Sequence, residues 1–355
     1  MTFRPRPTFP ALAVSFLGTL LVLACTKPSS DPPAVESVEP TAIVAEWALA
    51  IHGGAGTIDR DTDAETRSAY IAALSEALSH GKAQLESGAS ALDVVEEVVR
   101  ILEDAPQFNA GKGAVFNAAG KNELDAAIMD GRDLSCGAVA GLRTVRNPIT
   151  LARHVMTDTG HVLLMGDGAE AFADEVGVER ADDEYFYTEH RWQQWQKKLA
   201  NDDQGKMGTV GAVARDKNGD LAAATSTGGL TGKKWGRVGD VPVIGAGTFA
   251  DNRTVAVSGT GKGEEFIRHS VANSVSTLVA YEGLGVEEAA NRVVHGVLAE
   301  GDGGLIAVGH DGAIALVFNS QGMFRGAADS NGRFDVAIWE EEYPGEAANS
   351  GQVDE

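Results

Sequence analysis

The hydrophobic pattern of the chain changes its period at Gly208, and no other feature constrains the fold as strongly. Before this point the pattern is mainly helical. Thr62-x-x-Glu65 and Ser90-x-x-Asp93 each predict the start of an amphipathic helix, because a hydroxyl three residues before an acid can cap the first helical turn. The chain up to Gly208 is therefore expected to supply mostly helices.

A strand is expected ahead of these helices. Residues Glu46 to Ile51 alternate large and small side chains and then break at His52-Gly-Gly-Ala-Gly56, which is the pattern of a strand that runs into a glycine turn. Two later stretches, Asp167 to Glu175 and Tyr185 to Leu199, have the spacing of further helices.

After Gly208 the pattern indicates an antiparallel sheet. Thr209 to Ala214 and Leu221 to Thr225 flank Asn218-Gly219, which is the strongest short hairpin signal that a sequence offers. Further strands are predicted at Val241–Ala246, Thr254–Ser258, Leu305–Val308 and Ala313–Phe318, and helices at Glu264–Tyr281 and Val286–Leu298. Strands packed inside with helices outside predict a layered α+β fold.

Composition and charge exclude several classes of function. Of the 355 residues, 43% are hydrophobic and 23% are charged, which is typical of a globular chain. The 51 acidic residues outnumber the 29 basic ones, and a net charge of −22 repels a phosphate backbone, so nucleic acid is not an expected partner. None of the eight histidines forms a His-x-His or His-x-x-x-His pair, so the sequence predicts no zinc site and no catalytic metal.

The N-terminus has the pattern of an export signal. Arg4 and Arg6 precede an apolar run of 14 residues, Ala11 to Ala24, which is too short to span a bilayer comfortably. We therefore expect residues 1–24 to be a signal peptide. Val22-Leu-Ala-Cys25 resembles a bacterial lipobox, which implies export and a membrane-anchored lipoprotein on the periplasmic or cell-surface side. The alternative is an ordinary secretory signal that contains a cysteine.

Two further segments lack the composition of a packed core. Residues 25–46 contain four prolines among Ser, Asp and Glu, and are expected to form a flexible tether. The acidic tail from Glu340 to Glu355 is expected to be disordered. The folded domain is therefore expected between these segments.

Thr209 is the candidate nucleophile. No Gly-x-Ser-x-Gly motif is present, and His52 is interpreted first as a packed residue at a strand end. Thr209 follows a glycine at the end of a polar stretch, so cleavage of the Gly208–Thr209 bond would give it a hydroxyl and a free amine together. The glycine-rich stretch Ser258 to Glu264 lacks P-loop spacing, but its backbone N–H groups would suit a carboxylate or an oxyanion.

Several motifs in register carry a resemblance to one family. The motifs are His52-Gly-Gly-Ala-Gly56, Phe108-Asn-Ala-Gly-Lys-Gly113, Glu123-Leu-Asp-Ala126, Ile128-Met-Asp-Gly131, Gly208-Thr-Val-Gly-Ala-Val-Ala214, Thr225-Ser-Thr-Gly-Gly229, Gly236-Arg-Val-Gly-Asp240 and Ser258-Gly-Thr-Gly-Lys-Gly263. In order and spacing, from about Leu49 to Gly332, the chain resembles the plant-type (type III) L-asparaginases, also called isoaspartyl peptidases, which are N-terminal nucleophile (Ntn) hydrolases. The resemblance implies a four-layer αββα sandwich formed by two subunits from one autocleaved precursor, an α subunit of residues 47–208 and a β subunit of residues 209–355.

The resemblance also implies a mechanism. The Thr209 hydroxyl would attack the Gly208 carbonyl and cut the chain, and the freed α-amine would then serve as the base for the same hydroxyl. By the same resemblance, Thr227 hydrogen-bonds the nucleophile, and Thr260 with the Gly261 N–H forms the oxyanion hole.

Substrate recognition is implied for a second group of residues. Arg237 resembles the residue that grips the substrate α-carboxylate with two parallel hydrogen bonds, and Asp240 resembles the acceptor of the α-ammonium. Gly263 belongs to the same substrate-binding set. From the sequence alone, the alternative for Arg237 and Asp240 is a solvated ion pair in a loop. Asn109 matches a position near the nucleophile, where a structural role in a turn is the alternative.

The resemblance implies no cofactor other than a structural sodium ion, and an assembly of two αβ heterodimers. In relatives a matching loop wraps the ion with backbone carbonyls. The matching positions here are Leu102, Glu103, Ala105, Phe108, Ala110 and Lys112.

Together these features predict an autoprocessed threonine hydrolase that cleaves β-aspartyl (isoaspartyl) dipeptides and hydrolyses L-asparagine to L-aspartate and ammonia. Its partners would be small-molecule substrates, with the membrane reached only through the lipid anchor. One alternative is glycosylasparaginase, which shares the Gly236 to Asp240 region. The other is a surface-binding lipoprotein that has the same fold and stays uncut.

Overall fold

The structure, a computed structural model, describes residues 44–201, 208–340 and 342–344. The chain divides into two units, Met1–Ala42 and Ile43–Glu355, and all described residues belong to the second. The predicted signal peptide, Cys25 and most of the tether lie outside the described residues, as does most of the acidic tail. Within the described part, no helix is long and apolar enough to cross a membrane.

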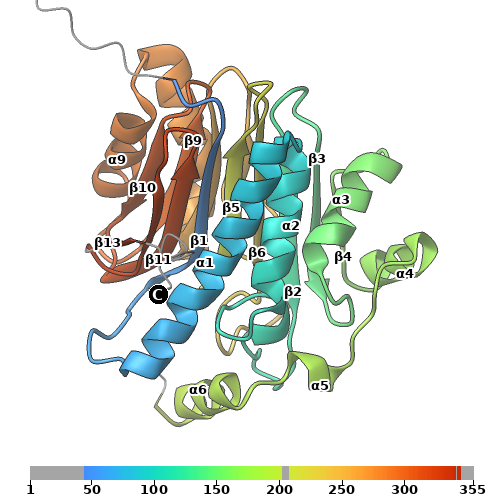
Figure 1. Ribbon diagram of the computed structural model, residues 1–355. Coiled ribbons are helices and arrows are strands. Elements are labelled where there is room, and N and C mark those ends of the chain that lie inside the picture. Colours follow the sequence, from blue (N-terminus) through green and yellow to red (C-terminus); the bar gives the residue numbers. More distant parts are fainter. Residues whose placement is uncertain (1–43, 202–207, 341, 345–355) are drawn as a thin grey trace, which may run out of the picture. The chain divides into compact units, whose positions relative to one another are not determined.

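Two β-sheets form the centre of the folded unit (Figure 1). Within the described residues, the large sheet has nine strands in the order β13-β12-β11-β1-β5-β6-β2-β3-β4, and the small sheet has four in the order β10-β9-β8-β7. The strands are β1 (Ala48–Gly56), β2 (Leu124–Asp130), β3 (Cys136–Leu142), β4 (Leu163–Met165), β5 (Val210–Arg215), β6 (Leu221–Thr227), β7 (Thr248–Ala250), β8 (Val255–Gly261), β9 (Gly303–Gly309), β10 (Ile314–Phe318), β11 (Gly322–Asp329), β12 (Phe334–Ala337) and β13 (Glu342–Pro344).

The alternation of side chains along the strands explains why the sheets stack. In β1, Leu49 and Ile51 belong to the core beneath the helices, whereas Ala48 and Ala50 belong to the core between the two sheets. Residues of β9, such as Ile306, meet these alanines from the small sheet. Small and large side chains from both sheets fill the space between them.

Helices cover the outer faces of both sheets. The core of the large sheet includes side chains of α1, α2 and α3, and the core of the small sheet includes side chains of α8 and α9 (Figure 1). The helices are α1 (Ala64–Ser87), α2 (Ala91–Asp104), α3 (Pro148–Asp158), α4 (Gly166–Val176), α5 (Asp183–Phe186), α6 (Glu189–Asn201), α7 (Gly263–His269), α8 (Val271–Thr277) and α9 (Val286–Gly296), with the 3₁₀-helix η1 (Gly111–Gly113) and the π-helix η2 (Leu278–Glu282). The predicted α+β class and αββα sandwich are confirmed.

Several predicted elements are confirmed, and the differences have local causes. Ser90 caps α2 as predicted, whereas Asp63 rather than Thr62 caps α1. The predicted helix Glu264–Tyr281 is interrupted at Ser270, whose φ of 47° lies outside the right-handed helical region.

One predicted strand is wrong, and two other expectations hold only in part. Val241–Ala246 forms turns instead of a strand, with the backbone N–H of Val243 donating to the Asp240 carbonyl at 3.0 Å. The first half is mainly helical, as predicted, and it also contains the strands β2, β3 and β4, which were not predicted. Within the tail expected to be disordered, Glu342–Pro344 form β13, which pairs with β12, and the residues after Pro344 lie outside the described residues.

The order of the large sheet brings the two halves of the chain together. β1, from the first half, lies between β11 and β5, and β2 pairs with β6. His52 of β1 faces Gly211 of β5 in the antiparallel register. The predicted glycine turn is instead a continuation of β1 through Gly56, which pairs with β11 after a register shift between His52 and Gly54. This glycine-rich end of β1 lies beside Thr209, just before β5.

Candidate active site

Thr209 lies buried at the N-terminal end of β5, with 5% of its surface exposed. Its Oγ1 lies 2.6 Å from the Gly208 carbonyl oxygen and 3.2 Å from Thr227 Oγ1. Thr227, at the end of β6, also lies 3.0 Å from the Gly208 oxygen through its Oγ1. The two threonines predicted to act together are therefore in contact at the predicted cleavage bond.

Asn109, in the loop after α2, holds the same carbonyl. Its Nδ2 donates to the Gly208 oxygen at 2.9 Å and to the Gly229 oxygen at 2.8 Å, while its Oδ1 accepts the Val115 backbone N–H at 2.9 Å. The amide is thus fixed in orientation by three bonds. Asn109 combines the two roles considered for it, a structural role in the turn and a contact with the predicted cleavage site.

Two glycines allow the backbone to approach this bond. Gly54 has a φ of 117°, and a Cβ at this position would lie 3.1 Å from Gly208 Cα and 3.2 Å from the Thr209 nitrogen. A Cβ at Gly208 would lie 3.1 Å from Asn109 Cβ. Gly54 lets the backbone of β1 pack directly against the Gly208–Thr209 peptide, and Gly208 lets Asn109 approach the same peptide.

The predicted oxyanion residues lie at the end of β8, next to the glycine-rich end of β1. Thr260 is fully buried, and its Oγ1 accepts the backbone N–H of Ala55 at 3.1 Å. Among the described residues this hydroxyl has no acceptor for its own proton, so it can donate to an anion. Gly261 has a φ of 155°, and a Cβ there would lie 2.1 Å from the Asp302 carbonyl oxygen, so the close turn requires glycine.

The predicted substrate-binding residues also come together. A Cβ at Gly263 would lie 2.8 Å from both Arg237 Nη2 and Asp240 Oδ1, so the missing side chain leaves space between the two charges. Gly229, which bonds Thr227 and Asn109, links this group to the nucleophile, because a Cβ there would lie 3.5 Å from Arg237 Nη1. The structure therefore brings the predicted catalytic residues and the predicted substrate-binding residues into one region.

Asp240 carries an unsatisfied acceptor. It is 5% exposed, and its Oδ2 is buried with no hydrogen-bond partner in the described residues. Burial raises the pKa of Asp240 from 3.8 to about 7, although the nearby Arg237 acts in the opposite direction. A bound cation would supply the missing donor and favour the ionised carboxylate.

Glu264, which the sequence analysis did not single out, binds one edge of Arg237. The Nε and Nη2 atoms of Arg237 donate to the two Glu264 carboxylate oxygens, each at 3.0 Å. This contact holds the pKa of Glu264 below its usual value. The pair orients the guanidinium and leaves its Nη1 side toward Gly239 and Gly229.

His52 was interpreted as a packed residue, and the structure shows it fully buried in a polar network. Its Nδ1 lies 3.1 Å from the Thr209 carbonyl oxygen, which can only accept, so Nδ1 carries the proton. Its Nε2 then accepts from Ser258 Oγ at 2.8 Å, and this hydroxyl continues to Thr225 and Thr248. Burial lowers the pKa of His52 from 6.5 to about 3, so the ring is neutral and orients the nucleophile's backbone.

The loop predicted to hold sodium turns tightly after α2. A Cβ at Gly111 would lie 2.4 Å from the Glu103 carbonyl oxygen, and one at Gly113 would lie 2.0 Å from the Phe108 carbonyl oxygen. Both glycines therefore allow the loop that carries Asn109 to pack closely on its own backbone. The ion itself and its full ligand set stay predictions.

Arg191 of α6, which the sequence analysis missed, is buried against the same loop. Its Nε donates to the Gly113 carbonyl at 2.7 Å and its Nη2 to the Gln107 carbonyl at 3.0 Å. Because its partners lie 78 and 84 residues away, no local pattern could have shown this role.

In the part of the chain that the structure describes, no three His, Cys, Asp or Glu side chains form a candidate metal site.

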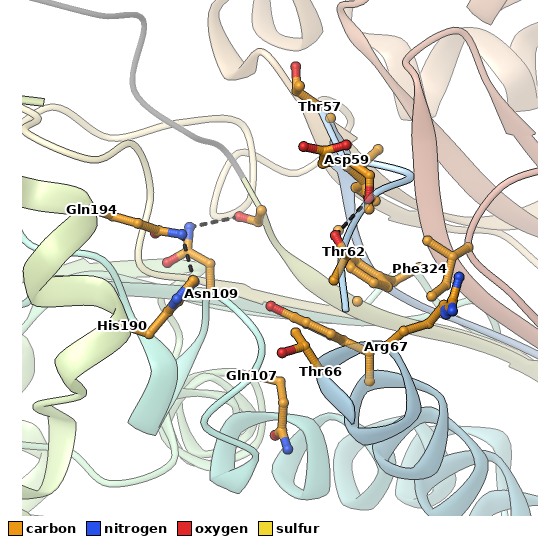
Figure 2. A pocket seen from close by; sticks show the side chains of 18 of the residues that line it. Thr57, Asp59, Thr62, Thr66, Arg67, Gln107, Asn109, His190, Gln194 and Phe324 are labelled. Carbon is orange, nitrogen blue, oxygen red and sulfur yellow. Dashed lines mark hydrogen bonds between the residues drawn. The ribbon is translucent and has the colours of Figure 1, made fainter. Parts of the chain in front are cut away.

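A cavity of about 340 Å³ opens beside the predicted cleavage bond. Gly54, Asn109 and Gly208 line one part of it. In Figure 2, Asn109, His190 and Gln194 lie on one side of the cavity, and Arg67 and Phe324 on the other.

Comparisons with known proteins identify the family. The sequence model described as asparaginase matches residues 45–338. A Salmonella typhimurium protein named isoaspartyl peptidase is 52% identical over 292 residues, which cover 78% of this chain and 93% of that protein. The isoaspartyl peptidase of Escherichia coli is 50% identical, with 78% and 91% covered, and the isoaspartyl peptidase/L-asparaginase of Mus musculus is 40% identical, with 89% and 96% covered. The chain therefore belongs to the asparaginase family of N-terminal nucleophile hydrolases.

Proposed function

We propose that the protein hydrolyses β-aspartyl dipeptides and L-asparagine, with Thr209 as a nucleophile released by cleavage after Gly208. The observation that carries the proposal is the set of contacts on the Gly208 carbonyl oxygen. Thr209 Oγ1 lies 2.6 Å from it, and Thr227 Oγ1 and Asn109 Nδ2 lie 3.0 and 2.9 Å from it. A nucleophile thus stands beside a carbonyl whose oxygen two donors already hold.

Self-cleavage would proceed as an N-to-O acyl shift. The Thr209 hydroxyl adds to the Gly208 carbonyl carbon, and the donors on Thr227 and Asn109 stabilise the negative charge that develops on its oxygen. The C–N bond then breaks, the hydroxyl proton passes to the departing nitrogen, and Gly208 remains as an ester on Thr209. Water hydrolyses this ester and leaves a Gly208 carboxylate and a free Thr209 amine.

The freed amine would then act as base and acid in turnover. An unperturbed α-amine has a pKa of about 7.7 to 8.0, so it can accept the Thr209 hydroxyl proton near neutral pH. The oxygen attacks the side-chain carbonyl of the aspartyl unit, and the Thr260 hydroxyl with the Gly261 N–H receives the oxyanion. The amine returns the proton to the leaving nitrogen, and water releases aspartate from the ester.

The geometry of the charged pair supports an aspartyl substrate with both α-groups free. The buried Oδ2 of Asp240 has no donor among the described residues, and an α-ammonium would supply one. Arg237 is held by Glu264 with its Nη1 side free of that carboxylate, so it can bind an α-carboxylate. The relatives named isoaspartyl peptidase support the same substrate class.

The intact mass of the purified protein tests the cleavage. We expect two chains, the second beginning at Thr209, and one uncut chain in Thr209→Ala. Thr209→Ser, which keeps the hydroxyl, is the matched control and should still be cut. Cleavage of the alanine variant at the same bond would contradict the mechanism, because no hydroxyl would remain at position 209.

A substrate panel tests recognition. The panel contains β-Asp-Leu, asparagine, N-acetyl-asparagine and sugar-linked asparagine. Acetylation leaves Asp240 without a cation, and losing such a buried contact commonly costs about 2 to 5 kcal/mol, roughly 30-fold to several-thousand-fold in rate. Equal rates on blocked and free substrates would contradict the role of Asp240. A strong preference for the sugar-linked substrate would instead favour glycosylasparaginase.

A further inference from the structure

The cavity beside the cleavage bond does not belong to the aspartyl-binding group. None of Arg237, Asp240 and Gly263 lines it. One part of it is lined by Gly54 and Gly208, and aromatic side chains also line it. The cavity is therefore available for a part of the substrate other than the aspartyl unit.

The proton transfer in the proposed mechanism places the leaving group in this cavity. In the proposed mechanism, the leaving nitrogen takes its proton from the Thr209 amine, so it must pass close to the Thr209 nitrogen. That nitrogen lies against Gly54, where a Cβ would be only 3.2 Å away, and Gly54 lines the cavity. Gly208, which would leave this position after cleavage, lines it as well.

Aromatic rings form the wall nearest to Gly54. Phe324 of β11 faces Gly54 in the antiparallel register, and Tyr70 of α1 stacks on Phe324 with ring centroids 4.3 Å apart. Both residues line the cavity. Such a wall suits an apolar or aromatic side chain of a leaving amino acid.

Arg67 adds a positive charge to the aromatic wall. It lies three residues before Tyr70 on α1, lines the cavity and is partly buried, with its guanidinium carbon 5.9 Å from the centre of the Trp339 ring. Among the described residues its guanidinium has no carboxylate partner, in a chain where 51 acids outnumber 29 bases. An anionic ligand would complete this site.

The other charged groups that line the cavity do not offer a comparable site. Arg191 already donates to two backbone carbonyls and to Gln194 Oε1. Asp59 accepts the backbone N–H of Asp61 at 2.9 Å and would repel an anion. Arg67 is therefore the cation of this cavity best placed to bind a carboxylate.

We propose that this cavity binds the amino acid released from an isoaspartyl dipeptide, with its side chain against Tyr70 and Phe324 and its free carboxylate at Arg67. The proposal rests on the proposed function and names the leaving group that the same site prefers. The substrate class is thus a β-aspartyl dipeptide with an apolar or aromatic second residue and an unblocked C-terminus.

Steady-state kinetics of the processed enzyme test the proposal. The substrates are β-Asp-Phe, its C-terminal amide, and asparagine, whose leaving group is only ammonia and which serves as the internal reference. In Arg67→Gln, we expect kcat/KM for β-Asp-Phe relative to asparagine to fall roughly 10-fold to 100-fold, mainly through KM, because a charge-assisted contact is lost. The ratio for the amide should change less than about threefold, because the amide has no charge for Arg67 to bind.

Two further variants separate carboxylate binding by Arg67 from an effect on the packing around Trp339. Arg67→Lys keeps a positive charge, so its kcat/KM for β-Asp-Phe relative to asparagine should lie between that of Arg67→Gln and that of the wild type. Arg60→Gln is the matched control, because the Arg60 guanidinium lies 5.5 Å from the same Trp339 ring but Arg60 does not line the cavity. In Arg60→Gln, kcat/KM for β-Asp-Phe relative to asparagine should match that of the wild type.

An unchanged ratio in Arg67→Gln, or an equal fall for β-Asp-Phe and its amide, would overturn the assignment of Arg67 while leaving the proposed function intact. An equal fall in Arg60→Gln would also overturn it, because the effect would then come from the packing around Trp339. A wild-type enzyme that hydrolyses none of the three substrates would overturn the proposed function and this inference together.

Discussion

Replacing Asp240 by Asn should make the protein more stable and less active at once. Burial raises the pKa of Asp240 from 3.8 to about 7. As the pH rises through this range, the unfolded chain loses the proton first and the folded protein keeps it. The free energy of unfolding therefore falls by about 1.4 kcal/mol per pH unit, and by about 4 kcal/mol in all.

Asn resembles the protonated acid in shape and cannot ionise. We therefore expect Asp240→Asn to raise the free energy of unfolding by up to about 4 kcal/mol at pH 8 and to leave it nearly unchanged at pH 4. Hydrolysis should be impaired, because no anion remains to bind the substrate ammonium. Urea titrations at pH 4, 6 and 8 measure the effect, and a Thr209→Ala background keeps a single chain for reversible unfolding.

Asp251→Asn is the matched control with the opposite sign. Asp251 is also buried, but its hydrogen bond and ion pair with Arg253, 2.6 Å away, hold its pKa below the usual value. Its contribution to stability is present above its unfolded pKa and is lost as the pH falls, so Asp251→Asn should destabilise the protein at pH 8. A destabilised Asp240→Asn at pH 8, or a gain that is equal at pH 4 and pH 8, would refute the reasoning.

Other predictions follow from features described above. The His52 imidazole, with a pKa lowered to about 3, should show no titration above pH 4 in NMR spectra, and a transition between pH 5 and 8 would contradict its neutral state. Gly211→Ala would place a Cβ 2.5 Å from His52 Nε2, so it should destabilise the protein by about 1 to 3 kcal/mol and slow cleavage, whereas Gly168→Ala, with no atom within 4 Å, should do neither. If the loop after α2 binds sodium, replacing Na⁺ by choline should lower the melting temperature, and an unchanged value would count against the ion. Metabolic lipid label should attach to the exported chain and disappear in Cys25→Ala, and label that persists in this variant would refute the lipobox assignment. The native mass should correspond to two αβ units, and a single unit in solution would contradict the predicted assembly.

Much of the fold could be predicted from local pattern. The hairpin around Gly219 joins β5 and β6 because turn residues separate two apolar runs, and the hydroxyl of Ser90 starts α2 because it satisfies a free N–H. The strand expected at Val241–Ala246 could not be predicted correctly from local pattern. Its apolar residues are equally compatible with turns, and the turns form because the chain folds back onto Asp240, with Gly245 at a φ of 90°.

The chemistry of the site could be predicted only in part, because its contacts join distant segments. The proximity of Thr209 and Thr227 was implied by a family resemblance and by no local pattern. His52 meets the Thr209 carbonyl across 157 residues, and Glu264 meets Arg237 across 27, so neither partner is visible in a sequence window. The raised pKa of Asp240 depends on burial that only the assembled sandwich creates.

The place of β1 in the large sheet determines what a cut after Gly208 can do to the molecule. β1 lies between β5 and β11, which both follow the cut, and one edge of β2 pairs with β6, which also follows it. The two pieces would therefore be interlocked through the centre of one sheet, and neither could diffuse away without breaking backbone ladders on both edges of β1. Dilution would not separate them, and their parting would be an unfolding event governed by a kinetic barrier.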